Sequence, residues 1–94
     1  MSKVVLSGHI VVPESDLVAV LVELPTHIEL TRQETGCLMF EVTQDPDDEH
    51  KFHVYEEFTD PSAFRHHQAR VGASEWGRVA TNVARHYQVE GLND

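Results

Sequence analysis

Residues 36–67, GCLMFEVTQDPDDEHKFHVYEEFTDPSAFRHH, contain the two segments that decide the fold. Residues 37–43 and 51–58 are rich in β-branched and aromatic residues and alternate in polarity, which predicts two strands. Residues 44–50 between them carry an Asp and Pro cluster typical of a turn, so we predict a β-hairpin. Leu38, Phe40 and Val42 share one face of the first strand. In the second strand, Glu56 falls on the face that is otherwise apolar.

Upstream of the hairpin, residues 4–12 are β-branched and apolar, and Pro13 ends them by removing a backbone donor. They predict the first strand. Ser15 is a good helix cap and Gly36 a usual helix stop, and Pro25 between them predicts either a kink or two helical pieces. The apolar residues of this amphipathic helix recur at helical spacing: Leu17, Val20, Leu21, Leu24 and Ile28.

Downstream, Asp60 followed by Pro61 predicts the start of a helix, and Gly72 predicts its end. One side of this helix carries Phe64, His67, Gln68 and Val71. Ser74 caps another helical segment, which carries Trp76, Val79, Ala80 and Val83. Residues 84–90 predict a final strand with Tyr87 and Val89 pointing inward. The order β-α-β-β-α-α-β over a single domain, residues 1–94, predicts an α+β, ferredoxin-like antiparallel sheet with its helices on one face.

The other face of the predicted sheet holds several apolar residues: Val5, Val11, Cys37, Met39 and Tyr55. Such a face is too apolar to lie against water in a stable monomer. We therefore expect a homodimer whose sheets face each other.

Composition excludes several classes of partner. The chain has 94 residues and a formal net charge of −9, which repels nucleic acid and anionic lipid surfaces. One cysteine rules out an internal disulfide and a cysteine-rich zinc site. The N-terminal residues show neither a cleavage site nor a membrane span, so we expect a cytoplasmic protein.

Seven histidines raise the question of a metal site, but they show no HExxH spacing. His50 and His53 lie three apart at a strand start, where a period of two points them to opposite faces. The acidic residues 45–49 lack the pattern of an EF-hand loop and indicate a turn. Cys37 is expected to be a small packing residue rather than a nucleophile. We therefore expect no metal site.

Glu56 and His67 are the best candidates for chemistry, because both are expected to point inward, one from the strand and one from the next helix. A carboxylate among apolar side chains needs a partner, and an imidazole beside it becomes a better base. The alternative is a buried polar pair that only ties helix to sheet. Phe58, Phe64 and Trp76 have a similar alternative, since aromatic residues at such spacing are often core.

These residues resemble the antibiotic biosynthesis monooxygenase family, small dimeric α/β-barrel proteins that include quinol monooxygenases. The similarity runs from Val4 to about Val89. The residues that carry it are Glu34, Gly36, Cys37, Leu38, Tyr55, Glu56, Phe58, Asp60, Phe64 and His67.

The resemblance implies oxygenation without metal, flavin or haem, in which a small quinol or phenol is itself the electron donor to dioxygen. His67 would be the base and Glu56 would orient it. Phe40, Phe58, Phe64 and Trp76 would form the walls of a substrate pocket.

Haem-degrading relatives use an inward Asn on the first strand, a Trp at the end of the third and a His ligand after the next helix. This chain has Gly8, Phe58, and Trp76 with Gly77 in the matching regions, which argues against haem degradation. The fold also serves other functions. A non-catalytic small-molecule binding or accessory protein remains the alternative.

Overall fold

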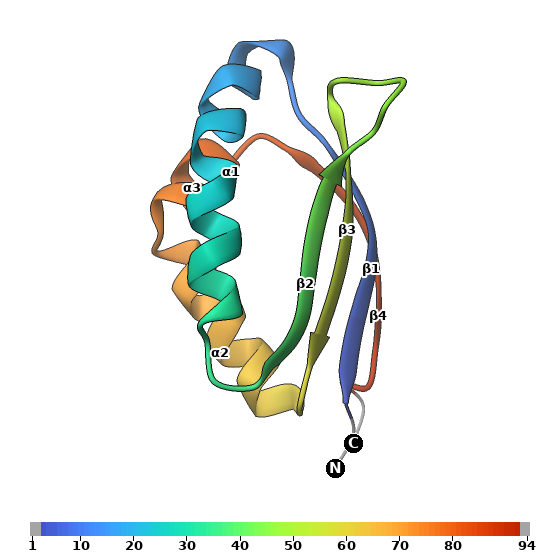
Figure 1. Cartoon of the computed structure of the whole chain (residues 1–94), viewed down its shortest axis with the longest axis vertical. Helices are drawn as coiled ribbons and strands as arrows, with labels where there is room; N and C mark the ends of the chain where they lie inside the picture. Colours follow the sequence, from blue (N-terminus) through green and yellow to red (C-terminus); the bar gives the residue numbers. More distant parts are fainter. Residues whose placement is uncertain (1–2, 93–94) are drawn as a thin grey trace.

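The computed structural model describes residues 3–92 and has one antiparallel sheet with its helices on one side (Figure 1). The strand order across the sheet is β2-β3-β1-β4. This is the α+β, ferredoxin-like fold that the sequence predicts. The elements are β1 (Val4–Val11), the 3-10 turn η1 (Glu14–Asp16), α1 (Leu17–Arg32), β2 (Cys37–Gln44), β3 (Lys51–Phe58), α2 (Pro61–Gly72), α3 (Glu75–Val79) and β4 (Ala84–Glu90).

Two of the predicted helix caps are confirmed. The side chain of Asp60 accepts from the N–H of Ala63 at 2.8 Å, and that of Ser74 accepts from the N–H of Gly77 at 3.2 Å. Each satisfies a donor that the first helical turn leaves free. The cap predicted at Ser15 is wrong, because that residue lies inside η1.

The helix α1 is one continuous helix that contains Pro25, so the alternative of two helical pieces is wrong. It ends at Arg32, before the predicted stop at Gly36. Gly36 lies in the turn to β2 with a φ of +91°, a conformation that favours glycine. The helix α3 likewise ends earlier than the predicted helical segment, because it stops at Val79 and Val83 lies beyond it.

A β-bulge at the start of β2 changes which side chains face the helices. Cys37 pairs with Phe58 and Met39 pairs with Glu57, so Leu38 is left unpaired. One extra residue reverses the alternation on its N-terminal side. Cys37 therefore packs against the core and does not belong to the opposite face, and Leu38 is 53% exposed rather than inward.

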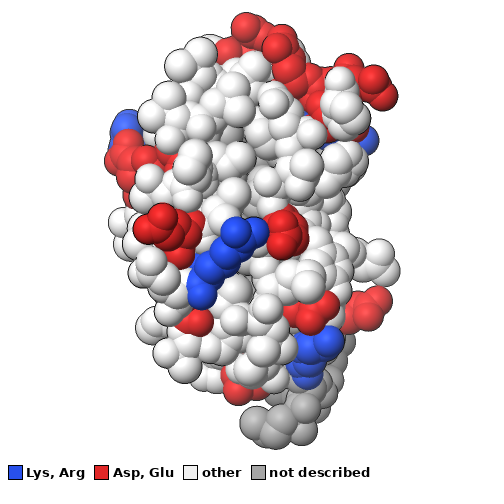
Figure 2. Space-filling view, viewed as in Figure 1, with Lys and Arg blue, Asp and Glu red and all other residues white. Residues whose placement is uncertain are grey.

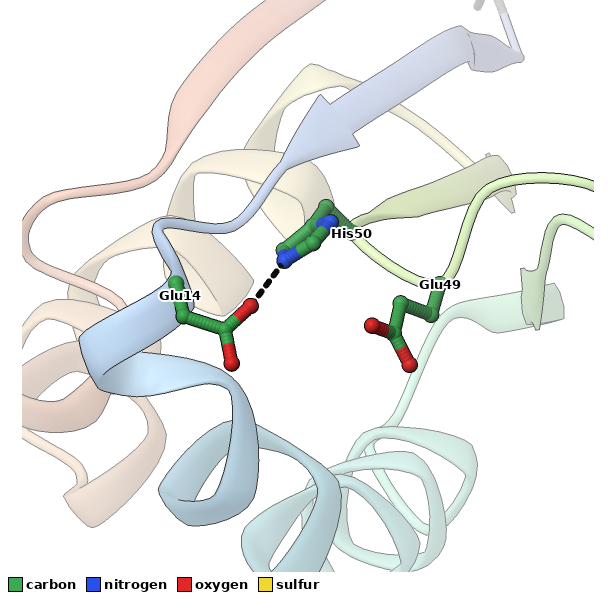
Figure 3. Close-up of side chains that lie close together, drawn as sticks. All are labelled: Glu14, Glu49 and His50. Atoms are coloured by element: carbon green, nitrogen blue, oxygen red, sulfur yellow. Dashed lines mark hydrogen bonds and ion pairs between the residues drawn. The ribbon is translucent and has the colours of Figure 1, made fainter.

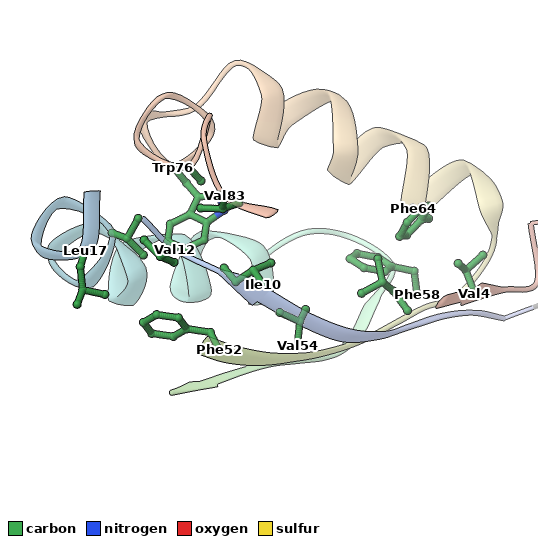
Figure 4. Close-up of a cluster of buried hydrophobic side chains, with 13 residues drawn as sticks. Val4, Ile10, Val12, Leu17, Phe52, Val54, Phe58, Phe64, Trp76 and Val83 are labelled. Atoms are coloured by element: carbon green, nitrogen blue, oxygen red, sulfur yellow. The ribbon is translucent and has the colours of Figure 1, made fainter. Parts of the chain in front are cut away.

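The core lies between the sheet and the helices (Figure 4). Val4, Phe58 and Phe64 gather at one end of it, while Leu17 and Trp76 lie at the other. Leu6 from β1 and Phe52 from β3 belong to this core and are almost fully buried. Burial of this apolar surface is the main force that holds α1 and α2 on the sheet.

The buried stripe of α1 is more polar than its sequence predicts. Leu17 and Val20 are buried as expected, but the next buried positions are His27 and Thr31. Leu21, which the apolar spacing places inward, is 39% exposed. Two polar side chains are thus brought inside the protein on the helix that faces β2.

The strand β4 is one edge of the sheet, and Tyr87 and Val89 point from it to the inner face, as predicted. Tyr87 pairs with Gly8 and Val89 with Leu6, so both share the face of the buried Leu6. They are nevertheless 38% and 37% exposed. The sheet places them on the predicted face, but the edge position leaves them only partly covered.

The face of the sheet away from the helices, called the outer face below, is mixed in character. Val5, Val11, Met39 and Tyr55 lie on it as expected. Polar residues stand between them in the pairing pattern: Ser7, His9, Glu41, Thr43, Lys51, His53, Glu57, His86, Gln88 and Glu90. The apolar residues therefore do not form a continuous patch.

Acidic side chains gather at the end of the molecule where the β2–β3 loop lies beside the start of α1 (Figure 2). This loop contains Asp45, Asp47, Asp48 and Glu49. Its chain reverses through Asx turns, since the Asp45 and Asp48 side chains accept from backbone N–H groups two residues later. Among residues 3–92, no helix combines the length and the apolar character that a membrane crossing needs.

Candidate active site

A buried polar cluster lies between α1, β3 and α2, and His67 is at its centre. The cap at Asp60 fixes the start of α2, and His67 follows two turns later on the buried side with 3% exposure. Glu56 reaches the same place from β3 and is 6% exposed. The structure therefore brings together the two residues that the sequence singles out.

Glu34, in the turn after α1, holds one side of the His67 ring. The Nδ1–H of His67 donates to Oε1 of Glu34 at 2.9 Å, because a carboxylate can only accept. Arg70 donates to the other oxygen of Glu34 and, at 2.9 Å, to the hydroxyl of Thr31. These contacts leave Nε2 of His67 as the nitrogen that can accept a proton.

Glu56 lies on the Nε2 side of His67, and the expectation that it orients the ring is corrected. Its Oε1 is 3.8 Å from Nε2, which is too long for a hydrogen bond. That oxygen is buried and has no hydrogen-bond partner. Glu34 therefore orients the imidazole, and Glu56 faces the nitrogen that would do the chemistry.

The protein environment disfavours charge on both of these groups. Burial, together with the nearby Glu34 carboxylate, raises the pKa of Glu56 to about 7. Burial also lowers the pKa of His67, although the Glu34 carboxylate opposes this change. Near neutral pH, Nε2 of His67 carries a lone pair, and Glu56 is close to its pKa, so its protonated and ionised forms are both present.

Of the four aromatic residues predicted as pocket walls, two contact His67 and two do not. Phe58 and Phe40 contact the imidazole directly, with ring centroids 4.9 and 5.7 Å away. Phe64 packs on Phe58 at 5.7 Å and is one layer farther out. Trp76 stacks on His27 instead, at 4.4 Å with only 3° between the ring planes. All four aromatic side chains are buried, so they also serve as core.

His27 is a site residue that sequence reasoning missed. It is 5% exposed, its ring lies 6.4 Å from that of His67, and its Nδ1 has no hydrogen-bond partner. Burial lowers the pKa of His27 to about 3, so this ring stays neutral. The signal in the sequence was a histidine seven residues after the buried Val20, on the same side of the helix.

Among the surface hollows of residues 3–92, four open ones are lined by neither His67 nor Glu56. One of about 460 Å³ lies between the α1–β2 turn and the start of α2. Its lining residues are Thr35, Gly36, Thr59, Asp60, Ser62, Ala63 and His66. They follow Glu34 and precede His67 in the chain, so this hollow is at the same end of the helices as the polar cluster.

Three acid or imidazole groups meet at the start of α1, away from His67 (Figure 3). Oε1 of Glu14 lies 2.6 Å from Nε2 of His50, and Glu49 completes a group whose ligand atoms lie within 4.8 Å of one another. These are ligand types that hold divalent cations. The two closest atoms already satisfy each other, and both glutamates are exposed, so we interpret the group as a surface ion pair.

Comparison with known proteins agrees with this architecture. A family model described as antibiotic biosynthesis monooxygenase matches residues 4–79. No curated protein matches the chain significantly.

Solved structures share the fold at low identity. One, described as a candidate antibiotic biosynthesis monooxygenase from Nitrosomonas europaea, has a TM-score of 0.78 and 18% identity, with 97% of each chain covered. Another with the same description, from Deinococcus radiodurans, has a TM-score of 0.77 and 21% identity, with 97% of this chain and 93% of that one covered. A conserved protein of unknown function from Bacteroides thetaiotaomicron has a TM-score of 0.77 and 13% identity over 94% and 95% of the chains. At such identities the likeness establishes the fold alone.

Proposed function

Because the chain belongs to the antibiotic biosynthesis monooxygenase family, we propose that it oxidises a small aromatic quinol or phenol with dioxygen and uses no metal, flavin or haem. The substrate itself would supply the electrons. In the balanced reaction RH₂ + O₂ → RO + H₂O, the substrate loses one hydrogen from a hydroxyl and one from a ring carbon, and that ring carbon gains an oxygen atom. The substrate thus gives four electrons to dioxygen, and the second oxygen atom leaves as water.

The observation that carries the proposal is the pair of facing atoms, Oε1 of Glu56 and Nε2 of His67, 3.8 Å apart with no hydrogen bond between them. The two atoms are 3.8 Å apart, so one oxygen atom can lie at a normal hydrogen-bond distance of about 2.8 Å from both of them at once. A substrate hydroxyl in that position would be held by Glu56 and would lose its proton to His67. The phenolate gives up an electron more readily than the phenol, so the proton transfer prepares the substrate for dioxygen.

The surroundings support the same chemistry. Phe40 and Phe58 line the imidazole and would exclude water from a reactive phenolate or radical. The Glu34 carboxylate raises the basicity of His67 and fixes its tautomer through Nδ1. His27, neutral and with a free Nδ1, is suited to hydrogen-bond a second oxygen on the substrate.

Oxygen uptake with a panel of hydroquinones, catechols and hydroxynaphthalenes tests the proposal. We expect His67→Ala to lower kcat/KM by about 10²-fold or more, because a positioned base contributes that much. His67→Gln is a second variant that keeps most of the buried volume. His66→Ala is the matched control, since His66 is the exposed neighbour on the same helix. Wild-type turnover in a folded His67 variant would contradict the assignment.

Glu34→Gln tests the orienting role separately. Loss of the carboxylate lowers the pKa of His67, so the rise of the rate with pH should move to lower pH. If Glu34 had only a structural role, Glu34→Gln would change the folded fraction but would not shift the dependence of the rate on pH. Tight quinol binding without oxygen uptake would instead favour a non-catalytic binding protein.

We also propose that the protein acts as a homodimer whose two sheets meet at their outer faces. Val11 and Met39, 37% and 44% exposed, are the side chains that a second copy would cover. The polar residues among them would need partners across the interface.

A further inference from the structure

Two polar side-chain atoms among residues 3–92 are buried without a hydrogen-bond partner, and both belong to the polar cluster around His67. They are Oε1 of Glu56 and Nδ1 of His27. The proposed proton transfer uses the first of these atoms and does not need the second. A buried polar atom without a partner loses its hydration and gains no contact in return, so an apolar side chain at position 27 would cost less. A ligand that supplies the missing hydrogen bond would explain the imidazole.

The imidazole of His27 is held in place by packing, and this leaves Nδ1 free. Trp76 stacks flat on the ring, with 4.4 Å between the ring centroids. Phe40 meets the same ring nearly at a right angle, with centroids 5.3 Å apart and 83° between the planes. A polar group whose ring is fixed by its neighbours while its nitrogen has no partner is preorganised for a ligand.

One hydrogen-bond network holds both His27 and His67. The hydroxyl of Thr31 donates to the backbone carbonyl of His27 at 2.8 Å. The same hydroxyl accepts from Arg70 at 2.9 Å, and Arg70 also donates to the carboxylate of Glu34. Since Glu34 binds Nδ1 of His67, the turn of α1 that carries His27 is tied to the group that orients the proposed base.

Phe40 brings the two unpartnered atoms into one neighbourhood. It pairs with Glu56 across β2 and β3, and paired residues of antiparallel strands point to the same face. Its ring also contacts the imidazoles of His27 and His67, at 5.3 and 5.7 Å. The centroids of these two imidazoles are 6.4 Å apart. A flat aromatic ligand on Phe40 would therefore meet polar groups at two separate points of its edge.

We propose that His27 determines specificity: it hydrogen-bonds a second oxygen of the substrate and so selects aromatic compounds with two oxygens over phenols with one. This role rests on the proposed function, because it takes the first hydroxyl to lie between Glu56 and His67. Nδ1 of a neutral imidazole donates in one tautomer and accepts in the other, so both a hydroxyl and a carbonyl oxygen fit it. An analogue without that oxygen would leave the nitrogen buried and unpaired, and the site would reject it.

Anaerobic calorimetry with hydroquinone and para-cresol tests this role, because the cresol has a methyl group of similar size in place of one hydroxyl. Catechol and ortho-cresol form a second pair, with adjacent positions. The quantity measured is the ratio of the two dissociation constants within a pair. We expect the wild type to prefer the diol in at least one pair. His27→Leu should reduce that preference about tenfold or more, the effect of losing one hydrogen bond to a buried group.

Two variants of similar shape separate the hydrogen bond from the packing. His27→Leu and His27→Asn both remove the ring that stacks on Trp76, but only asparagine keeps a polar group near the place of Nδ1. His27→Asn should therefore retain much of the preference for the diol. His66→Leu makes the same change at an exposed histidine of α2 and should leave the preference unchanged. If His27→Leu fails to fold, His27→Phe takes its place, because it keeps an aromatic ring beside Trp76.

Oxygen uptake separates this proposal from the oxygenation on which it rests. Turnover with the same preference for diols in the wild type and in folded His27→Leu would overturn the role of His27 but not the oxygenation. A preference that depends on His27 in binding, without oxygen uptake, would support the role of His27 and contradict the oxygenation. Equal losses in His27→Leu and His27→Asn would overturn the role, because they would follow from packing. A wild type that binds none of the four compounds would overturn both proposals.

Discussion

Glu56 and Glu57 are neighbours in β3, and the alternation of the strand gives them opposite environments. Glu56 points into the core and has no hydrogen-bond partner for Oε1. Glu57 points to the outer face, where Lys3 at 3.2 Å and the hydroxyl of Tyr55 donate to it. The pKa of Glu56 is therefore raised to about 7, mainly by burial, and that of Glu57 is lowered by its two donors. One residue of register separates a group suited to proton transfer from an ordinary surface carboxylate.

This contrast predicts opposite effects of pH on two conservative variants. Folded Glu56 keeps its proton up to about pH 7, against 4.5 for the unfolded chain, so the wild type loses stability as pH rises through that window. Glu56→Gln removes this loss, and its free energy of unfolding relative to the wild type should rise by up to about 3 kcal/mol between pH 4 and 8. Glu57→Gln should cost stability at neutral pH, and that cost should shrink as pH falls below 4.5. Urea denaturation across pH measures both, and parallel curves for Glu56→Gln and wild type would contradict the prediction.

At the scale of elements, the turn from α1 into β2 positions Glu34 against His67. Gly36 holds this turn with a φ of +91°, and an added Cβ would lie 2.6 Å from Cβ of Ala63 and 2.9 Å from Oγ1 of Thr59. Gly36→Ala should therefore lower the free energy of unfolding by about 2 kcal/mol or more. Gly72→Ala is the control, because no atom lies within 4 Å of its added Cβ and alanine favours a helix. Chemical denaturation should show no loss for Gly72→Ala, and equal losses in both variants would rule out strain at Gly36 as the cause.

The same elements show what local sequence predicts and what it does not. The hairpin and the caps at Asp60 and Ser74 were predictable, because alternation and capping depend on neighbours in the chain. The bulge at Leu38 was not, since an unpaired residue appears only when β2 meets β3. His27 was missed because apolar spacing favoured Leu21 for the buried face of α1. The spacing of apolar residues predicts the buried side of a helix or strand only where that side carries no buried polar residue such as His27.

The candidate site was predictable in part for the same reason. Glu56 stood out as an acidic residue on an apolar face, and His67 lay on the inward side of the next helix. Glu34 gave no such signal, because it lies in a turn, where periodicity carries no information about direction. Its contact with His67 joins residues that are 33 apart in the chain. The residue that orients the imidazole could therefore be identified only from the folded structure.

The whole molecule uses the two faces of one sheet differently. The inner face supports the core and the Glu34–His67–Glu56 cluster, and the outer face carries His9, His53 and His86 together with Val11 and Met39. Dimerisation at the outer face would leave the inner cluster intact in each copy. It would also bring the polar side chains of two outer faces into one interface, where they need partners.

Sedimentation of a surface variant tests where two copies meet. Met39→Asp places an uncompensated charge in the proposed interface, beside Glu57, and should convert a dimer to monomer or aggregate. Tyr55→Asp should act in the same way. Val18→Asp is the control, because Val18 is 74% exposed on α1, on the other side of the sheet, and should leave the dimer unchanged. Dimers of unchanged stability in both Met39→Asp and Tyr55→Asp would show that the copies meet at another surface.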